Sequence, residues 1–203
     1  MTYTPGRKTS VLARIILEKE FKRVLDVGCS KGYLGEETRA QNPGIEFAGI
    51  DVSKEALAEA KKSGYVQTIQ KDLNEVPLAF PELKGPSFDC MVFADVLEHT
   101  LQPSEVLGAL LPFLEKDGRV FVALPNVAFL PLRVKLLLGK WDYKKSGIMD
   151  ESHARFYNLK SARALLEENG LHTVRMESFP KRIPSWIWPS LLAITFLFEC
   201  ERK

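Results

Sequence analysis

The 203-residue chain lacks the features that mark disulfide-rich, zinc-scaffold and nucleic-acid-binding proteins. Its three cysteines, Cys29, Cys90 and Cys200, show no CxxC or zinc-finger spacing. This excludes a disulfide framework and favours reduced thiols in a cytosolic protein. The net charge is only +2 and the basic residues are scattered, so no nucleic-acid partner is expected.

The sequence also has no long hydrophobic run. Residues 1–7 lack the apolar segment of a signal peptide. The most apolar late stretch, residues 186–198, is broken by Pro189 and is too short for a transmembrane helix. We therefore predict a cytoplasmic protein without a transmembrane segment. A peripheral membrane contact through Trp186 and Trp188 is the alternative interpretation of this stretch.

The composition, 45% hydrophobic and 27% charged, is typical of a folded domain, and we predict one domain over residues 1–203. Apolar runs alternate with helical patterns, which favours a parallel, doubly wound α/β sheet. After Asn126 this alternation stops, and residues 127–158 are interpreted as a substrate-side insertion. Strands are expected at about 22–27, 45–50, 65–70, 88–94, 119–124, 171–178 and 193–199. We expect Thr9 or Ser10 to cap a first helix and Ser53 to cap the helix after the second strand. A turn at 116–118 should lead into the fifth strand, and the insertion should start as a helix over 127–138.

Residues 24–35 are interpreted as a buried strand, a glycine turn and the start of a helix. Their glycine spacing differs from that of dinucleotide sites, and Asp26 at the strand end would repel a pyrophosphate. A carboxylate there suits a cationic ligand such as the ammonium group of S-adenosylmethionine (SAM). Asp51 could then accept both ribose hydroxyls, and Asp72 the adenine amino group, while Leu73 packs on the ring.

The segments 25–32, 50–53, 71–73 and 88–99 resemble the motifs of class I SAM-dependent methyltransferases in order and spacing. His153-Ala154-Arg155-Phe156-Tyr157 resembles a stretch of the ubiquinone O-methyltransferase-like branch. The resemblance implies a Rossmann-like three-layer αβα sandwich of seven strands, the last one antiparallel, with S-adenosylhomocysteine (SAH) as product. It implies a cofactor site at Asp26, Gly28, Cys29, Ser30, Gly32, Asp51, Val52, Asp72, Leu73, Ala94 and Asp95.

One departure from that family is Ser30, which stands where a glycine is usual. Serine tolerates a positive φ less well than glycine, so an altered loop geometry is one possibility. The resemblance also implies direct methyl displacement, in which the protein mainly aligns the nucleophile and excludes water.

A second group of candidate residues follows the fourth strand. Asp95, Glu98 and His99 have D-x-x-E-H spacing, which places them on one face if the segment is helical. Together with His153 they could bind a divalent metal such as Mg or Zn. Alternatively, His153 or His99 is a catalytic base without a metal. A purely structural role for Glu98 and His99 is the third interpretation.

The leading hypothesis is therefore an enzyme that methylates a small-molecule acceptor, most readily at oxygen. A phenolic, sugar or lipid-like acceptor fits, and the apolar residues 127–138 could contact such an acceptor or a second subunit. Two rivals remain open, a SAM-binding regulatory protein without turnover and a nicotinamide-dependent oxidoreductase. Asp26 argues against the second.

Overall fold

The computed structural model describes residues 7–85, 87–179 and 188–203, so Trp186 lies outside the described residues. Backbone contacts divide the chain into two compact units. The first comprises residues 1–93 and 109–119, and the second comprises residues 94–108 and 120–203.

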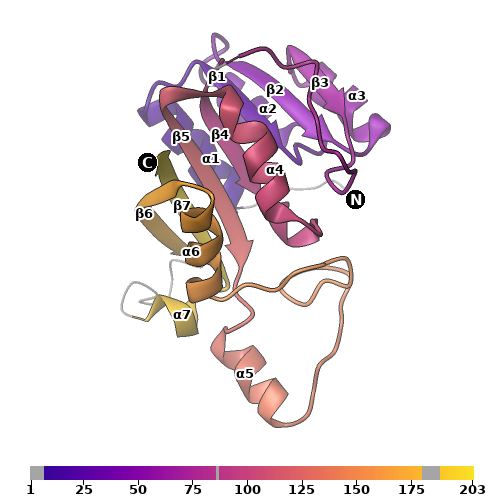
Figure 1. The fold of residues 1–203 in the computed structure, drawn as a ribbon, viewed down its shortest axis with the longest axis vertical. Helices are drawn as coiled ribbons and strands as arrows, with labels where there is room; N and C mark the ends of the chain where they lie inside the picture. The colour runs from indigo at the N-terminus through magenta and orange to yellow at the C-terminus, as the bar shows by residue number, and fades with distance from the viewer. Residues whose placement is uncertain (1–6, 86, 180–187) are drawn as a thin grey trace. The chain divides into compact units, whose positions relative to one another are not determined.

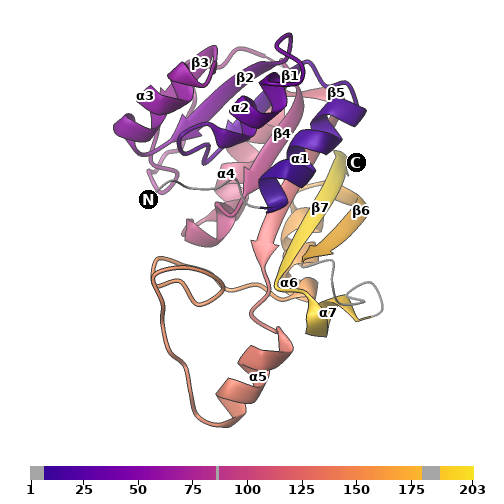
Figure 2. The same cartoon turned by 180° about the vertical axis from the view of Figure 1, so that it is seen from behind.

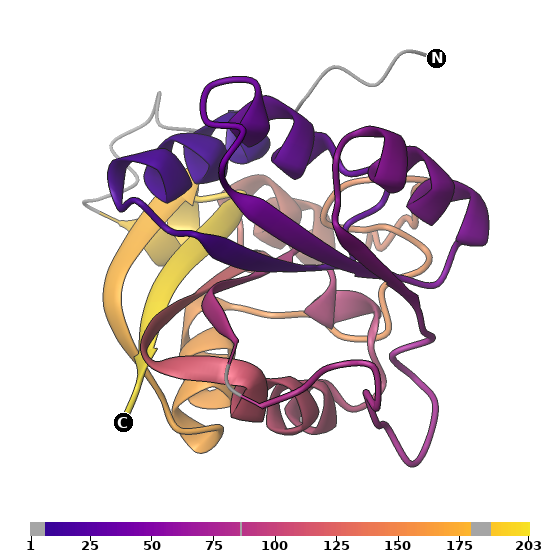
Figure 3. The same cartoon turned by 90° about the horizontal axis from the view of Figure 1, so that it is seen from above.

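The first unit holds parallel strands with helices between them (Figure 1). Strand β1 pairs in parallel with both β2 and β4, and β2 pairs with β3, so Leu25 lies opposite Ala48 and Met91. Figure 3 shows α1, α2 and α3 on the same side of these strands. Its elements are α1 (Arg7–Glu18), β1 (Arg23–Val27), α2 (Tyr33–Arg39), β2 (Glu46–Asp51), α3 (Lys54–Lys62), β3 (Gln67–Gln70) and β4 (Phe88–Ala94).

The core of this unit follows from the apolar strand sequences. The four consecutive residues from Cys90 to Phe93 are buried, as expected for a strand that is covered on both faces. Helix α1 buries Leu12, Ile15 and Ile16 from one face. Ser53 caps α3, as predicted, because its side chain accepts a hydrogen bond from the amide of Ala56 at 3.1 Å.

The second unit is built on an antiparallel pair, β6 and β7, with β5 beside β7 (Figure 2). The register places Val122 opposite Phe198 and shifts once in β6, between Thr173 and Arg175. The remaining elements of the chain are the 3-10 turns η1 (Leu97–His99) and η2 (Leu111–Phe113), α4 (Pro103–Leu110), β5 (Leu114–Pro125), α5 (Leu130–Leu137), α6 (Leu159–Glu168), β6 (Leu171–Phe179), α7 (Pro189–Leu192) and β7 (Thr195–Arg202).

The strands form a seven-stranded mixed sheet in the order β3-β2-β1-β4-β5-β7-β6, with flanking helices. Strand β7 runs antiparallel to both of its neighbours. The predicted Rossmann-like α/β sandwich with an antiparallel last strand is thereby confirmed. Among the described helices, none is both long enough and apolar enough to span a lipid bilayer.

Several predicted boundaries were wrong for identifiable reasons. Helix α1 already begins at Arg7, so Thr9 and Ser10 lie inside it rather than capping it. Strand β5 begins at Leu114, because the charged residues 115–117 extend it with exposed side chains instead of forming a turn. Helix α5 begins at Leu130 rather than Val127, since Pro131 is accommodated only in the first turn of a helix.

Candidate functional site

The glycine turn after β1 is held in a left-handed path. Gly28, Ser30 and Gly32 have φ angles of 72°, 47° and 79°. The amides of Gly28 and Cys29 both donate to the carbonyl of Ile50, at 2.8 and 3.0 Å, which ties the turn to the end of β2. Ser30 therefore takes the conformation that glycine would favour, at a cost of about 1–2 kcal/mol.

Asp51 compensates for that strain. The Ser30 amide donates to Asp51 Oδ2 at 2.8 Å, and the Ser53 amide donates to Oδ1 at 2.9 Å. Both oxygens are fixed, yet a carboxylate offers about four acceptor positions, so two remain. The side chain is half-exposed, and Val52 beside it is 61% exposed. The arrangement presents two oriented acceptors next to an apolar surface.

Asp26 differs from the expectation that its carboxylate points into an open crevice. It is only 5% exposed, and its Oδ2 accepts a hydrogen bond from the Tyr65 hydroxyl at 2.6 Å. Burial raises the pKa of Asp26 from 3.8 to about 7, although the Tyr65 hydrogen bond opposes the shift. Asp26 is therefore poised between its neutral and charged forms near neutral pH.

Tyr65 is a site residue that sequence reasoning missed. Its hydroxyl also accepts a hydrogen bond from the Gly35 amide at 3.2 Å. A Cβ added at Gly32, Gly35 or Gly49 would lie closer than 3 Å to the Tyr65 ring. The glycines thus make room for an aromatic side chain under the turn. The only signal in the sequence is an aromatic residue, directly after Gly64, in a unit that is rich in glycine.

The end of β3 lies beside the end of β2, because the Lys71 amide donates to the Asp51 carbonyl at 3.0 Å. Asp72 is exposed, and its Oδ1 accepts a hydrogen bond from the Asn74 amide at 2.9 Å. Leu73 is half-buried, whereas Cys29 is buried and burial raises the pKa of its thiol. The predicted cofactor residues of the first unit therefore gather at the carboxyl ends of β1, β2 and β3.

The remaining predicted residues lie in the second unit. Ala94 ends β4 and is half-buried, as is Asp95, which has a φ of 55°. The Asp95 amide donates to the Ala123 carbonyl at 3.2 Å. The left-handed residue turns the chain into η1, which contains Glu98 and His99. Only Glu98 and His99 belong to this single 3-10 turn, so the predicted helical face does not extend to Asp95.

His153 is brought to His99 by backbone hydrogen bonds. The amides of Ala154 and Arg155 both donate to the Glu98 carbonyl, at 2.9 and 3.0 Å. The two imidazole rings meet edge to face with their centroids 4.7 Å apart. The insertion and η1, which are more than 50 residues apart in sequence, therefore present two histidines at one place.

The hydrogen bonds of the two rings define which nitrogens are available. His153 Nδ1 lies 3.1 Å from the Ile148 carbonyl, and His99 Nδ1 lies 3.2 Å from the Ser152 carbonyl. Because a carbonyl oxygen only accepts, we assign the proton to Nδ1 in both rings, which leaves Nε2 with its lone pair. Burial of the ring, and to a smaller extent electrostatic repulsion from His99, lower the pKa of His153 below 6.5. His153 is therefore neutral and basic at neutral pH.

Glu98, 1% exposed, forms a group with His99 and His153 whose possible metal-ligand atoms lie within 4.8 Å of one another. Two ligands of one tetrahedral zinc ion lie about 3.4 Å apart. The most distant pair of the group would therefore have to approach by up to about 1.4 Å, and its carboxylate and imidazole donors suit a divalent ion. Asp95 is not a member of this group.

A family model, curated relatives and solved structures are all similar to this chain. Residues 2–175 match the family model described as a methyltransferase domain. Curated relatives include ubiquinone biosynthesis O-methyltransferases from Nitrosococcus oceani (35% identical over 107 residues, 52% of this chain) and Aeromonas salmonicida (30% over 106 residues, 52% of this chain). Each match covers 44% of the relative, less than half its length.

Solved structures share the fold at low sequence identity. A SAM-dependent methyltransferase from Archaeoglobus fulgidus superposes with a TM-score of 0.66 at 17% identity, covering 97% of this chain and 95% of that one. Magnesium protoporphyrin IX methyltransferase from Synechocystis, solved with bound SAH, gives 0.68 at 18% identity, covering 97% and 83%.

Proposed function

This chain belongs to the methyltransferase-domain family, and from this premise we propose that it is an enzyme that transfers a methyl group from SAM to an oxygen atom of a small-molecule acceptor. The observation that carries the proposal is the Asp51 carboxylate, which the Ser30 and Ser53 amides hold in place at the end of β2. The three buried free thiols also fit a reducing compartment such as the cytoplasm.

The residues of the first unit fit SAM chemically. Asp51 has two acceptor positions left for a pair of ribose hydroxyls, and Val52 offers an apolar surface beside it. Asp72 and Leu73 would meet the adenine. Asp26, ionised by a nearby ammonium group, would balance its positive charge. When bound, SAM supplies an electrophilic methyl group and a neutral sulfur leaving group.

The second unit supplies the base. His153 Nε2 carries a lone pair, because Nδ1 donates to the Ile148 carbonyl. In the proposed reaction this nitrogen would take the proton of the acceptor hydroxyl, and SAM would supply the methyl group from its sulfonium and leave as SAH. The His99 ring, which meets the His153 ring edge to face with centroids 4.7 Å apart, positions that ring and lowers the pKa of His153. The acceptor oxygen is thereby activated without a strongly basic side chain.

Calorimetric titration with SAH tests the cofactor part. We expect the wild-type protein to bind SAH and Asp51→Ala to bind it at least about tenfold more weakly, since two hydrogen bonds to a charged group are lost. Asp117→Ala, which removes an exposed carboxylate from β5, is the matched control and should bind normally. Absence of SAH binding to folded wild-type protein, or binding of NADH in its place, would overturn the proposal.

Methyl transfer itself needs a second assay. Release of labelled product from methyl-labelled SAM, measured over phenolic, sugar and lipid-like acceptors, should detect turnover with at least one class. SAH binding without turnover on any of them would favour a SAM-binding regulatory protein instead.

A metal at Glu98, His99 and His153 is the second candidate feature of this site, favoured by their grouping within 4.8 Å. Such an ion would lower the pKa of an acceptor hydroxyl. Elemental analysis of protein purified without chelator should then find about one divalent ion per chain, and Glu98→Gln should lose it. Activity that is unchanged by chelator, in protein without metal, would assign His153 the role of base alone.

A further inference from the structure

The insertion after β5 carries more exposed apolar surface than its folding explains. Helix α5 has eight residues and buries none of them. Its side chains Val134, Leu136 and Leu137 are 47%, 55% and 86% exposed, and Leu138 after it is 67% exposed. A helix this short gains little stability from its own hydrogen bonds in water. Something apolar must therefore cover at least part of this surface.

The insertion also encloses a cavity of about 380 Å³. This volume falls in the range that holds small organic ligands. The walls are mostly carbon and come from α5, the chain before it and the loop after it. The apolar residues among them are Val127, Leu132, Leu136, Trp141, Met149 and Phe156.

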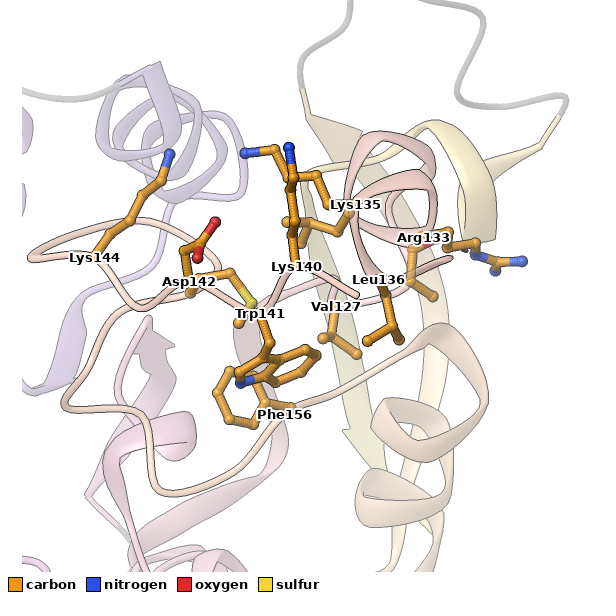
Figure 4. A pocket seen from close by; sticks show the side chains of 12 residues that line it. Val127, Arg133, Lys135, Leu136, Lys140, Trp141, Asp142, Lys144 and Phe156 are labelled. Atoms are coloured by element: carbon orange, nitrogen blue, oxygen red, sulfur yellow. Dashed lines mark hydrogen bonds between the residues drawn. The ribbon is translucent and has the colours of Figure 1, made fainter. Parts of the chain in front are cut away.

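The rim of this cavity is cationic. Figure 4 shows the ammonium groups of Lys135, Lys140 and Lys144 on one side, with the Asp142 carboxylate among them. Trp141 and Phe156 lie on the opposite side of the cavity, stacked edge to face with centroids 5.5 Å apart. Arg133 also lines the cavity, so four positive groups against one negative group favour an anionic head, and the apolar walls favour an apolar body.

Phe156, which lines the cavity, connects it to the two histidines. Phe156 packs against His153 with ring centroids 6.0 Å apart, and His153 packs against His99. A molecule whose apolar body rests on Trp141 and Phe156 would thus be one aromatic ring away from the proposed base. The cavity and the base belong to the same unit of the chain, so this adjacency is part of its local structure.

We propose that this cavity binds the methyl acceptor and that the acceptor is an acidic amphiphile, with an apolar chain or ring system and a carboxylate or phosphate. The assignment of the ligand as acceptor rests on the proposed function. A second copy of this chain is a poor occupant of a twofold contact, because it would place the three rim lysines of each copy against one another.

Fluorescence of Trp141 tests the proposal directly. The chain has three tryptophans, so Trp186→Phe with Trp188→Phe leaves Trp141 as the only reporter. The probes are decanoate, decyltrimethylammonium and decanol, each below its micelle concentration. We expect decanoate to bind at least about tenfold more tightly than decyltrimethylammonium, since the rim attracts one head group and repels the other. Equal binding of the two would overturn the proposal.

Two matched pairs of variants locate the site. Leu136 lines the cavity and Leu137 does not, so Leu136→Asp should weaken decanoate binding about tenfold and Leu137→Asp should leave it unchanged. Lys140→Gln should reduce the preference for decanoate over decanol, whereas Lys145→Gln, outside the cavity, should not. Equal effects of both members of a pair would contradict the assignment. Circular dichroism verifies that each variant is folded.

The two proposals fail separately. SAH binding without selective decanoate binding would overturn the acceptor class and leave the proposed function intact. Selective decanoate binding without SAH binding would overturn the proposed function but keep the cavity as an amphiphile site. Vesicles of phosphatidylglycerol and of phosphatidylcholine complete the experiment: binding to the first in the absence of any decanoate binding would identify a lipid surface as the partner and overturn the single-molecule acceptor.

Discussion

The proposed cofactor site of the first unit, at the carboxyl ends of β1, β2 and β3, and the insertion of the second unit are organised in opposite ways. At the proposed cofactor site, backbone amides fix Asp51, and Tyr65 fills the space under three glycines. In the insertion, α5 buries no residue, and aromatic contacts and lysines surround a cavity. The first arrangement can hold one ligand in one orientation. The second can accept ligands that share only an apolar body and a negative charge.

The largest difference between the regions should appear in turnover. His153→Ala removes the proposed base and is expected to lower kcat about 100-fold or more, with SAH binding unchanged. His172→Ala, an exposed histidine on β6, is the control. A normal kcat for His153→Ala would show that His153 is not the base in methyl transfer.

The pH dependence of turnover sharpens the same point. Burial holds the pKa of His153 below 6.5, so its basic form persists as the pH falls to that value. We expect kcat to decrease on acidification with a midpoint below pH 6.5, and this limb should vanish in His153→Gln. A midpoint above 6.5 would contradict the assignment.

The close packing of glycines against Tyr65 should have the next largest effect, on the free energy of unfolding. Gly35→Ala forces a Cβ against the Tyr65 ring, which we expect to lower the free energy of unfolding by about 1–3 kcal/mol. Gly108→Ala, in a helix and with no atom near the added Cβ, should raise it by about 0.5–1 kcal/mol. Urea denaturation measures both. Equal changes in the free energy of unfolding for Gly35→Ala and Gly108→Ala would show that Tyr65 does not require a glycine at position 35.

A smaller effect is expected at Asp26. Tyr65→Phe removes the hydrogen bond that opposes the raised pKa, so Asp26 should become largely neutral at pH 7. SAH affinity should fall about three- to tenfold there and recover at higher pH, because the ligand's ammonium group needs the carboxylate. Tyr143→Phe, on the exposed insertion, is the control. An unchanged pH profile would exclude this role.

The same carboxyl group affects stability with a definite sign. Folding raises the pKa of Asp26 from 3.8 to about 7, so its contribution to stability is complete below pH 3.8 and is lost as the pH rises towards 7. Asp26→Asn should therefore show a shallower loss of stability over this range. Urea denaturation at several pH values measures the difference, and parallel curves for both proteins would contradict the raised pKa.

The sequence predicted the regular part of the molecule well, for physical reasons. Strand β4 was predicted with its true bounds because its run of apolar residues is interrupted only by Asp89 and is followed by Asp95. The N-cap of α3 followed from Ser53 alone. Tyr65 could not be predicted, because its role depends on the contacts it makes with glycines from α2, the turn and β2.

The candidate site was predictable only where spacing is local. Glu98 and His99 are neighbours on one turn, but their meeting with His153 depends on the path of the insertion, which two backbone hydrogen bonds to Glu98 determine. The cavity combines residues from 127 to 156 without a repeating pattern. The apolar character of residues 127–138 was recognised from the sequence. Whether they contact an acceptor or a second subunit was left open, because the sequence does not show the cavity that they form with later residues.

The central claim is that the cofactor and the acceptor are bound by different regions of the chain. Calorimetric titration of SAH into wild-type protein, Asp51→Ala and Leu136→Asp tests it most directly. The account predicts binding to wild-type and Leu136→Asp with equal affinity, and at least about tenfold weaker binding to Asp51→Ala. Weakened binding to Leu136→Asp together with normal binding to Asp51→Ala would contradict it.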